Sequence, residues 1–152
     1  MAINAAAITS EIAALSVRNV TIKDVTEIPE SVVNRDCPIF FPSPGNWLNG
    51  GNAANEESTT FGTPDSRLWH VSSGLNYIYL HSAVGAGRGN SDNYYDAVLD
   101  IEALITALVA LDVSGVDVVT VSHTPIKVMS SPTQTKFTGC EFTIAVRERI
   151  NA

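Results

Sequence analysis

The stretch from Leu68 to Val84 constrains the fold more than any other segment, because apolar residues recur with a period of two on both of its faces. Successive side chains of an extended chain point to opposite faces, so this pattern is typical of a strand covered on both sides. The two apolar sets are Leu75, Tyr77 and Tyr79 on one face and Ile78, Leu80 and Val84 on the other. The segment therefore predicts a central strand, formed either as one long strand or as two strands joined at a kink near Gly74.

Four other segments predict strands of the same sheet. Charged residues among the β-branched ones indicate that the first of these strands lies at an edge, and prolines bracket the second. Turn residues after the third indicate a hairpin, and the fourth alternates most regularly, as a half-buried strand does. These strands are predicted at residues 18–25, 37–42, 116–121 and 140–146.

Two segments carry apolar residues at helical spacing. The first, residues 3–15, predicts a short amphipathic helix, and the second predicts a long helix from about Ser91, as N-cap, to Leu111. We expect one face of the long helix to pack on the sheet and an acidic stripe on another face to be solvated. The packing set is Tyr95, Val98, Ile101, Ile105, Leu108 and Val109, and the stripe is Asp92, Asp96 and Asp100.

Residues 42–67 are rich in Pro, Gly, Asn, Ser and Thr and predict a long loop. Long loops in compact domains are typically lids, binding loops or segments that become ordered on assembly. Two aromatic residues in it, Trp47 and Phe61, are candidate interface residues, with the alternative that both fold back on the core. Arg88, in the glycine cluster 85–89, is a third interface candidate. We therefore expect a single α+β domain over residues 1–152, with a mainly antiparallel or mixed sheet, two principal helices packed on it and one long loop.

Composition excludes several classes of protein. The chain of 152 residues is 45% hydrophobic and 16% charged, outside the range in which whole chains stay disordered. Its formal net charge of -7 has the wrong sign for tight binding of nucleic acid. The most apolar stretch, residues 97–111, is interrupted by Asp100 and Glu102, and the N-terminus lacks the basic start of a signal peptide. We therefore expect a protein without a membrane span.

No motif in the sequence predicts catalysis or a bound cofactor. His70, His81 and His123 lack the spacing of a metal site, and Cys37 and Cys140 are predicted to be free thiols. The GAGRGNS segment departs from the dinucleotide and P-loop patterns, so a plain strand-to-helix turn is favoured over a phosphate site. No serine lies in a nucleophile elbow. The sequence thus predicts no catalytic residue, no metal and no cofactor, and a protein that is not an enzyme.

The pattern of elements resembles the tail terminator proteins of long-tailed bacteriophages, which also occur in prophages as minor tail or neck proteins. The segments that carry the resemblance span nearly the whole chain. They are INAAAITSEIAAL, VTEIPESVVNRDCPIFFPSPGNW, GLNYIYLHSAVGAGRG, DAVLDIEALITALVAL and GCEFTIAVRERI.

The resemblance implies a structural virion protein, made in the bacterial host cytoplasm and located in the virion tail or neck. It implies a homo-oligomeric ring, a hexamer in this family, that caps the tail tube and ends its polymerisation. Its partners would be the tail tube protein and the head-closure or connector protein, with DNA passing through the lumen without specific binding. Two alternatives stay open: a head-closure or neck adaptor protein of the same virion, and a cytosolic α+β domain that binds a small ligand beside residues 85–89.

Overall fold

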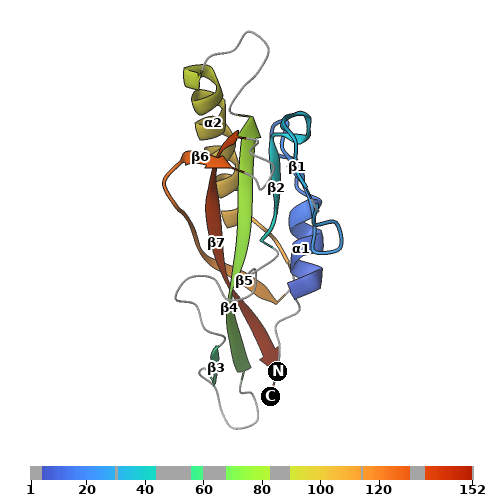
Figure 1. Cartoon of the computed structure of the whole chain (residues 1–152). Helices are drawn as coiled ribbons and strands as arrows, with labels where there is room; N and C mark the ends of the chain where they lie inside the picture. Colours follow the sequence, from blue (N-terminus) through green and yellow to red (C-terminus); the bar gives the residue numbers. More distant parts are fainter. Residues whose placement is uncertain are drawn as a thin grey trace.

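The computed structural model describes residues 5–29, 31–43, 56–59, 68–82, 90–113, 115–130 and 136–151. Its central feature is an antiparallel ladder between β4 (Leu68–Ser82) and β7 (Lys136–Asn151). The ladder pairs all 15 residues of β4, from Leu68 opposite Asn151 to Ser82 opposite Phe137, without a shift in register. Figure 1 shows one end of this ladder extending past both helices.

Short strands flank the ladder on both sides and complete a curled, mixed sheet of seven strands. β2 (Ile39–Pro42) and β3 (Glu56–Thr59) pair with different halves of β4, and β1 (Thr21–Ile22) lies parallel to β2. β5 (Val116–His123) and β6 (Lys127–Ser130) pair in succession along the other edge of β7. The outer strands are thus short or broken, which is how native sheets limit pairing at their edges.

Two helices, α1 (Ala5–Ala13) and α2 (Asn90–Val109), pack against one face of the sheet (Figure 1). The shared core is aromatic at its centre, where the Phe40 ring stacks on Tyr77 at 4.6 Å and meets the edge of Phe142 at 5.1 Å. The buried residues of this core come from both helices and from β2, β4 and β7. They include Ile8, Ile12, Phe40, Leu75, Tyr77, Tyr79, Ile101, Leu104, Leu108, Cys140, Phe142 and Ile144.

A smaller apolar cluster lies on the opposite face of the sheet. It contains Ile39, Phe41, Leu80 and Phe137, with Ile28, Val32 and Cys37 packed against it. These last three residues belong to the connection between β1 and β2, which includes a short 3-10 helix, η1 (Asn34–Asp36). Helices therefore cover one face, and this connection covers part of the other.

The strand predictions are confirmed where the alternation is regular. β4 is one continuous strand, and its two apolar faces enter the two different clusters as expected. The strand at 18–25 is an edge strand but shortens to Thr21–Ile22, and the strand at 37–42 begins at Ile39. The arrangement of helices packed on a mixed sheet agrees with an α+β class. Residues Glu56–Thr59 correct the predicted loop at 42–67, because they form β3 on the edge of β4.

The predicted orientation of α2 is wrong in part. The helix begins at Asn90, so Ser91 lies inside it and is not the N-cap. Tyr95 and Val109, expected in the core, are 63% and 60% exposed, whereas Asp100, expected in solvent, is 3% exposed. The buried face runs instead through Asn93, Ala97, Asp100, Ile101, Leu104 and Leu108. The physical reason is that both Asp100 oxygens find a hydrogen-bond donor, one in the buried Tyr79 hydroxyl and one in the half-exposed Arg18 guanidinium, so an ionisable residue can occupy the packed face.

Candidate functional site

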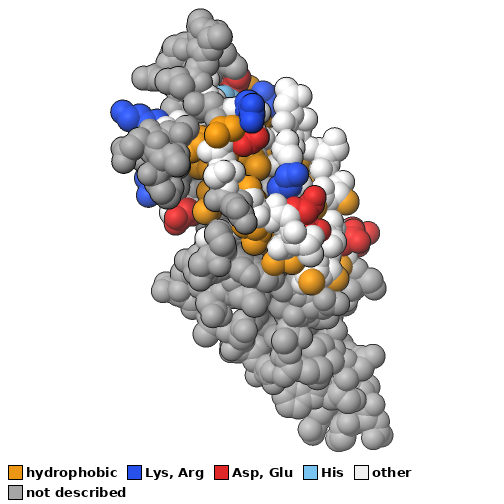
Figure 2. Space-filling model, turned by 45° about the vertical axis from the view of Figure 1, so that its right-hand side comes forward, with side chains coloured by type: hydrophobic (Ala, Val, Ile, Leu, Met, Phe, Trp, Pro, Cys, Tyr) orange, Lys and Arg blue, Asp and Glu red, His pale blue; other side chains and the backbone are white. Residues whose placement is uncertain are grey.

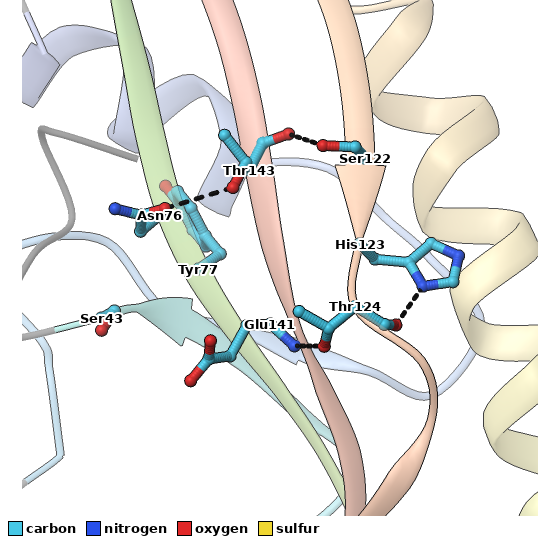
Figure 3. A pocket seen from close by; sticks show the side chains of 8 residues that line it. All are labelled: Ser43, Asn76, Tyr77, Ser122, His123, Thr124, Glu141 and Thr143. Carbon is cyan, nitrogen blue, oxygen red and sulfur yellow. Dashed lines mark hydrogen bonds between the residues drawn. The ribbon is translucent and has the colours of Figure 1, made fainter. Parts of the chain in front are cut away.

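A polar depression lies on the face of the sheet opposite the helices. Register places Asn76 of β4 beside Thr143 of β7, and Thr143 beside Ser122 of β5, so the three residues form a row across three strands (Figure 3). The Thr143 hydroxyl donates to Asn76 Oδ1 at 3.3 Å, and the Ser122 hydroxyl donates to the Thr143 carbonyl oxygen at 3.5 Å. The depression has a volume of about 340 Å³, and its other lining residues are Ser43, Tyr77, His123, Thr124 and Glu141.

A break between β5 and β6 shapes the rim of this depression. Three residues, Thr124–Ile126, span the interval opposite Cys140 and Glu141, and Pro125 has no N–H to give to the ladder. Thr124 restores the pairing: its N–H donates to the Glu141 carbonyl at 2.9 Å, and its hydroxyl accepts from the Glu141 N–H at 3.0 Å. The backbone of Glu141 is therefore held firmly, while its side chain is exposed at the rim.

Ser122, His123 and Glu141 are residue types of hydrolytic sites, but their arrangement does not join them. His123 is next to Ser122 in a strand, so the two side chains leave on opposite faces. The His123 ring packs near Phe142 of the main core, at 5.5 Å between centroids, and its Nδ1 lies 2.7 Å from the Thr124 carbonyl oxygen. Figure 3 shows the ring directed away from Ser122 and Glu141. The depression offers hydroxyl, amide and carboxylate groups, and its chemistry is that of a hydrogen-bonding surface.

A groove lies on the helical side of the molecule, between the α1–β1 connection and the outer side of α2. Its volume is about 560 Å³, and its floor is made largely of small apolar side chains. Two charged residues, Arg18 and Glu102, also line it. The other lining residues are Ser16, Val17, Leu99, Ala103, Thr106, Ala107 and Ala110.

Arg18 is held at the edge of this groove by a buried acidic network. Its Nε donates to Asp100 Oδ1 at 2.7 Å, and the Tyr79 hydroxyl donates to Asp100 Oδ2 at 2.6 Å. The Asp100 side chain is 4% exposed and the Arg18 side chain 39%. Arg18 also has a φ of 44°, a left-handed conformation that costs about 1–2 kcal/mol for a residue with a Cβ. Strained backbone of this kind is found preferentially at functional positions.

Figure 2 shows the distribution of charge over one side of the molecule. Within the described part of the chain, Lys and Arg side chains lie close to Asp and Glu side chains, around a patch of hydrophobic ones. The net charge of -7 is therefore not concentrated as a uniform acidic surface on the described part of this side.

Cys140 and His81 are buried, and Cys37 is half-buried. Both thiols are free, and burial raises the pKa of Cys37 and of Cys140 to about 12, with smaller contributions from the neighbouring charges of Asp36 and Glu141. Thiols with such a raised pKa are poor nucleophiles. His81 is 6% exposed, and its Nε2 lies 4.0 Å from Asp96 Oδ2.

The three interface candidates from the sequence, Trp47, Phe61 and Arg88, lie outside the described residues, as does the glycine cluster 85–89. Sequence analysis missed both the polar depression and the Arg18 groove. The alternation of β7 places Thr143 on its polar face, but nothing local in the sequence indicates that Asn76 and Ser122 lie beside it. Arg18 gave no signal, because its partner Asp100 is 82 residues away and was assigned to solvent.

Within the ranges that the structure describes, no group of three or more His, Cys, Asp and Glu side chains could hold a metal ion. No described helix is long and apolar enough to cross a membrane. Comparison of the sequence with models of known protein families gives no match, and comparison with curated proteins gives none either.

Proposed function

We propose that the chain is a structural virion protein that assembles into a ring on the end of a phage tail tube, ends tube polymerisation and joins the tail to the neck. The observation that carries the proposal is the presence of two unlike surfaces on opposite sides of one sheet. One is the polar depression over Asn76, Thr143 and Ser122, and the other is the small-residue groove beside α2.

A cyclic assembly of identical subunits requires two different contact surfaces on each subunit. In a ring each subunit uses one surface to contact the subunit before it and a different surface to contact the subunit after it. A symmetric dimer would need only one self-complementary surface. The depression and the groove differ in polarity and in shape, so they suit the first arrangement.

The charge of the chain supports passage of DNA through such a ring. Six copies would carry a formal charge of roughly -42, and a net negative field of this kind repels the phosphates of DNA. A protein that lets DNA pass without retaining it benefits from this sign of charge.

The arrangement of elements favours a tail terminator over a neck adaptor with a barrel architecture. A barrel-like head-closure protein is expected to consist mostly of short strands with little helix. Here α2 has 20 residues and packs with α1 on one side of a sheet whose described edges are formed by β1 and β3 on one side and by β5 and β6 on the other.

The proposal is tested by native mass spectrometry over a series of protein concentrations, with and without the tube protein encoded by the same phage or prophage. We expect a discrete ring, with six subunits as the favoured number, and binding of this ring to assembled tubes. A protein that stays monomeric at every concentration and ignores the tube protein would contradict the proposal. A thermal-shift screen with nucleotides and metabolites would then test the ligand-binding alternative.

A further inference from the structure

We propose that the connection between α1 and β1 is a latch, which opens locally away from α2 and is held closed by the bond from Arg18 to Asp100 against backbone strain. This connection is called the strap below and comprises residues 14–20. The motion lies within one copy of the chain, so it does not depend on the proposed ring. Its basis is that a strained backbone and a hydrogen bond to a buried carboxylate occur at the same residue, Arg18.

The strap has few attachments to the elements beneath it. Among the described residues, one hydrogen bond joins it to the sheet or to α2, the bond from Arg18 Nε to Asp100 Oδ1 at 2.7 Å. Val17 is the one strap residue that is buried, in the main core. The Val20 N–H donates to the Val17 carbonyl oxygen at 2.9 Å, which closes a turn within the strap itself. Segments with few buried contacts open locally at a lower free energy than the core does.

Two opposing contributions act on the strap at Arg18. Its φ of 44° is a left-handed conformation, and relaxing it favours the open form by about 5- to 30-fold in the equilibrium constant. The bond to Asp100 favours the closed form, because the carboxylate is buried and is paired there with a cationic donor. The Arg18 side chain is 39% exposed, so water can take the place of Asp100 when the strap leaves. The closed form therefore depends on one charge-assisted bond.

Opening of the strap changes the groove beside α2. Ser16, Val17 and Arg18 form one wall of this groove, and residues 99–110 of α2 form the other. Moving the first wall outward brings Asp100 and the apolar recess left by Val17 to the floor of the groove. The closed strap thus covers a carboxylate and an apolar recess that the open strap makes accessible.

Amide hydrogen exchange of the whole chain tests the latch. The Val20 N–H reports on the strap, because relaxing Arg18 breaks its bond to Val17, and the amides of the β4–β7 ladder report on global unfolding. In the wild-type chain we expect Val20 to exchange more than about a hundredfold faster than the ladder.

The contribution of the ion pair is tested with Asp100→Asn, which keeps the shape of the side chain and removes its charge. This substitution should raise the exchange rate at Val20 by about tenfold relative to any change in the ladder. The matched control is Glu102→Gln, which removes an exposed carboxylate that lines the same groove. The control should leave the rate at Val20 unchanged, and circular dichroism verifies that each variant retains the fold.

The contribution of strain is tested at Arg18 in the Asp100→Asn background. Arg18→Ala and Arg18→Gly both remove the guanidinium, but only glycine adopts a positive φ without strain from a Cβ. The glycine double variant should therefore exchange at Val20 at least about fivefold more slowly than the alanine double variant.

Three results would overturn the proposal. Exchange at Val20 that matches the ladder would show that the strap opens only with the whole fold. Equal effects of Asp100→Asn and Glu102→Gln, or a uniform rise at Val20 and in the ladder, would show that the Arg18–Asp100 bond does not hold the strap. Equal rates in the two double variants would exclude a contribution from strain. None of these results affects the proposed ring, which is tested separately by native mass spectrometry.

Discussion

Asp100 links the helical layer to the sheet through hydrogen bonds of its buried carboxylate. It sits on α2, accepts one hydrogen bond from Tyr79 of β4, and pairs with Arg18 of the α1–β1 connection. A buried carboxylate is tolerated only when its oxygens are satisfied, and here each oxygen has a donor at 2.7 Å or less. The bond from Arg18 fixes the guanidinium at the groove, so the groove is connected to the core through Asp100.

Tyrosine-to-phenylalanine substitutions at Tyr79 and Tyr77 should have different effects on stability. Both rings are fully buried, but the Tyr79 hydroxyl donates to Asp100, whereas the Tyr77 hydroxyl has no partner in the described part of the chain. Tyr79→Phe removes a hydrogen bond to a charged group and should cost about 1.5–3 kcal/mol of unfolding free energy. Tyr77→Phe removes an unsatisfied hydroxyl and should be neutral or slightly stabilising. Urea denaturation measures both; equal losses would show that the Asp100 bond does not contribute.

At the scale of elements, strands were more predictable from the sequence than the helix that covers them. Period-two alternation in β4 and β7 identifies both strands and assigns their faces, since each side chain must leave on one face or the other. In α2 the assignment of a face depends on which residues are counted as apolar. Counting Tyr95 and Val109 inward and Asp100 outward rotated the predicted face relative to the observed one, although Ile101 and Leu108 are buried as predicted.

The candidate sites were less predictable, for a related physical reason. Asn76, Thr143 and Ser122 become neighbours only through the register of three strands, and Arg18 meets Asp100 only through tertiary packing. Neither juxtaposition leaves a local motif in the sequence. Residue type and loop position pointed instead to Trp47, Phe61 and Arg88, which lie outside the described residues.

The orientation of α2 can be tested with two truncations on the same helix. Leu104 is fully buried, so Leu104→Ala should destabilise the fold by about 2–5 kcal/mol through lost burial and the cavity that remains. Val109 is 60% exposed, so Val109→Ala should change stability by no more than about 0.5 kcal/mol. Thermal and urea unfolding of the two variants provide the comparison. A large effect at Val109 with a small one at Leu104 would restore the orientation expected from the sequence.

For the whole molecule, the burial of two thiols and two tyrosine hydroxyls should make the folded state less stable at high pH. Desolvation raises the pKa of Cys37 and Cys140 from 9.0 to about 12, and it raises the pKa of Tyr77 and Tyr79 well above the ordinary value. In the unfolded chain these groups ionise at their ordinary values, while in the folded chain they stay neutral. Their contribution to stability is therefore complete below about pH 9 and is lost as the pH rises through the folded values.

The expected result is a urea midpoint that is constant through neutral pH, declines from about pH 9 and declines more steeply once the tyrosines would ionise, above about pH 10. Tyrosinate absorbance from the buried rings should appear together with unfolding and not before it. Replacing Cys37 and Cys140 by alanine should remove the part of the decline that begins near pH 9, which serves as the control. Ionisation of Tyr77 and Tyr79 in a chain that remains folded would contradict this prediction.

The unbroken pairing of β4 with β7 gives the molecule a mechanical property. Fifteen successive pairs without a bulge form a stiff beam about 50 Å long. The helices lie beside only part of this ladder, and its end near Leu68 and Asn151 projects beyond them (Figure 1). The first described core residue of β4 is Leu75, and residues 68–74 before it span about 23 Å, so a rotation of the core by about 10° would move the far end by roughly 4 Å. A small change of tilt where the core is held would thus become a displacement of nearly one strand spacing, about 4.8 Å, at the tip.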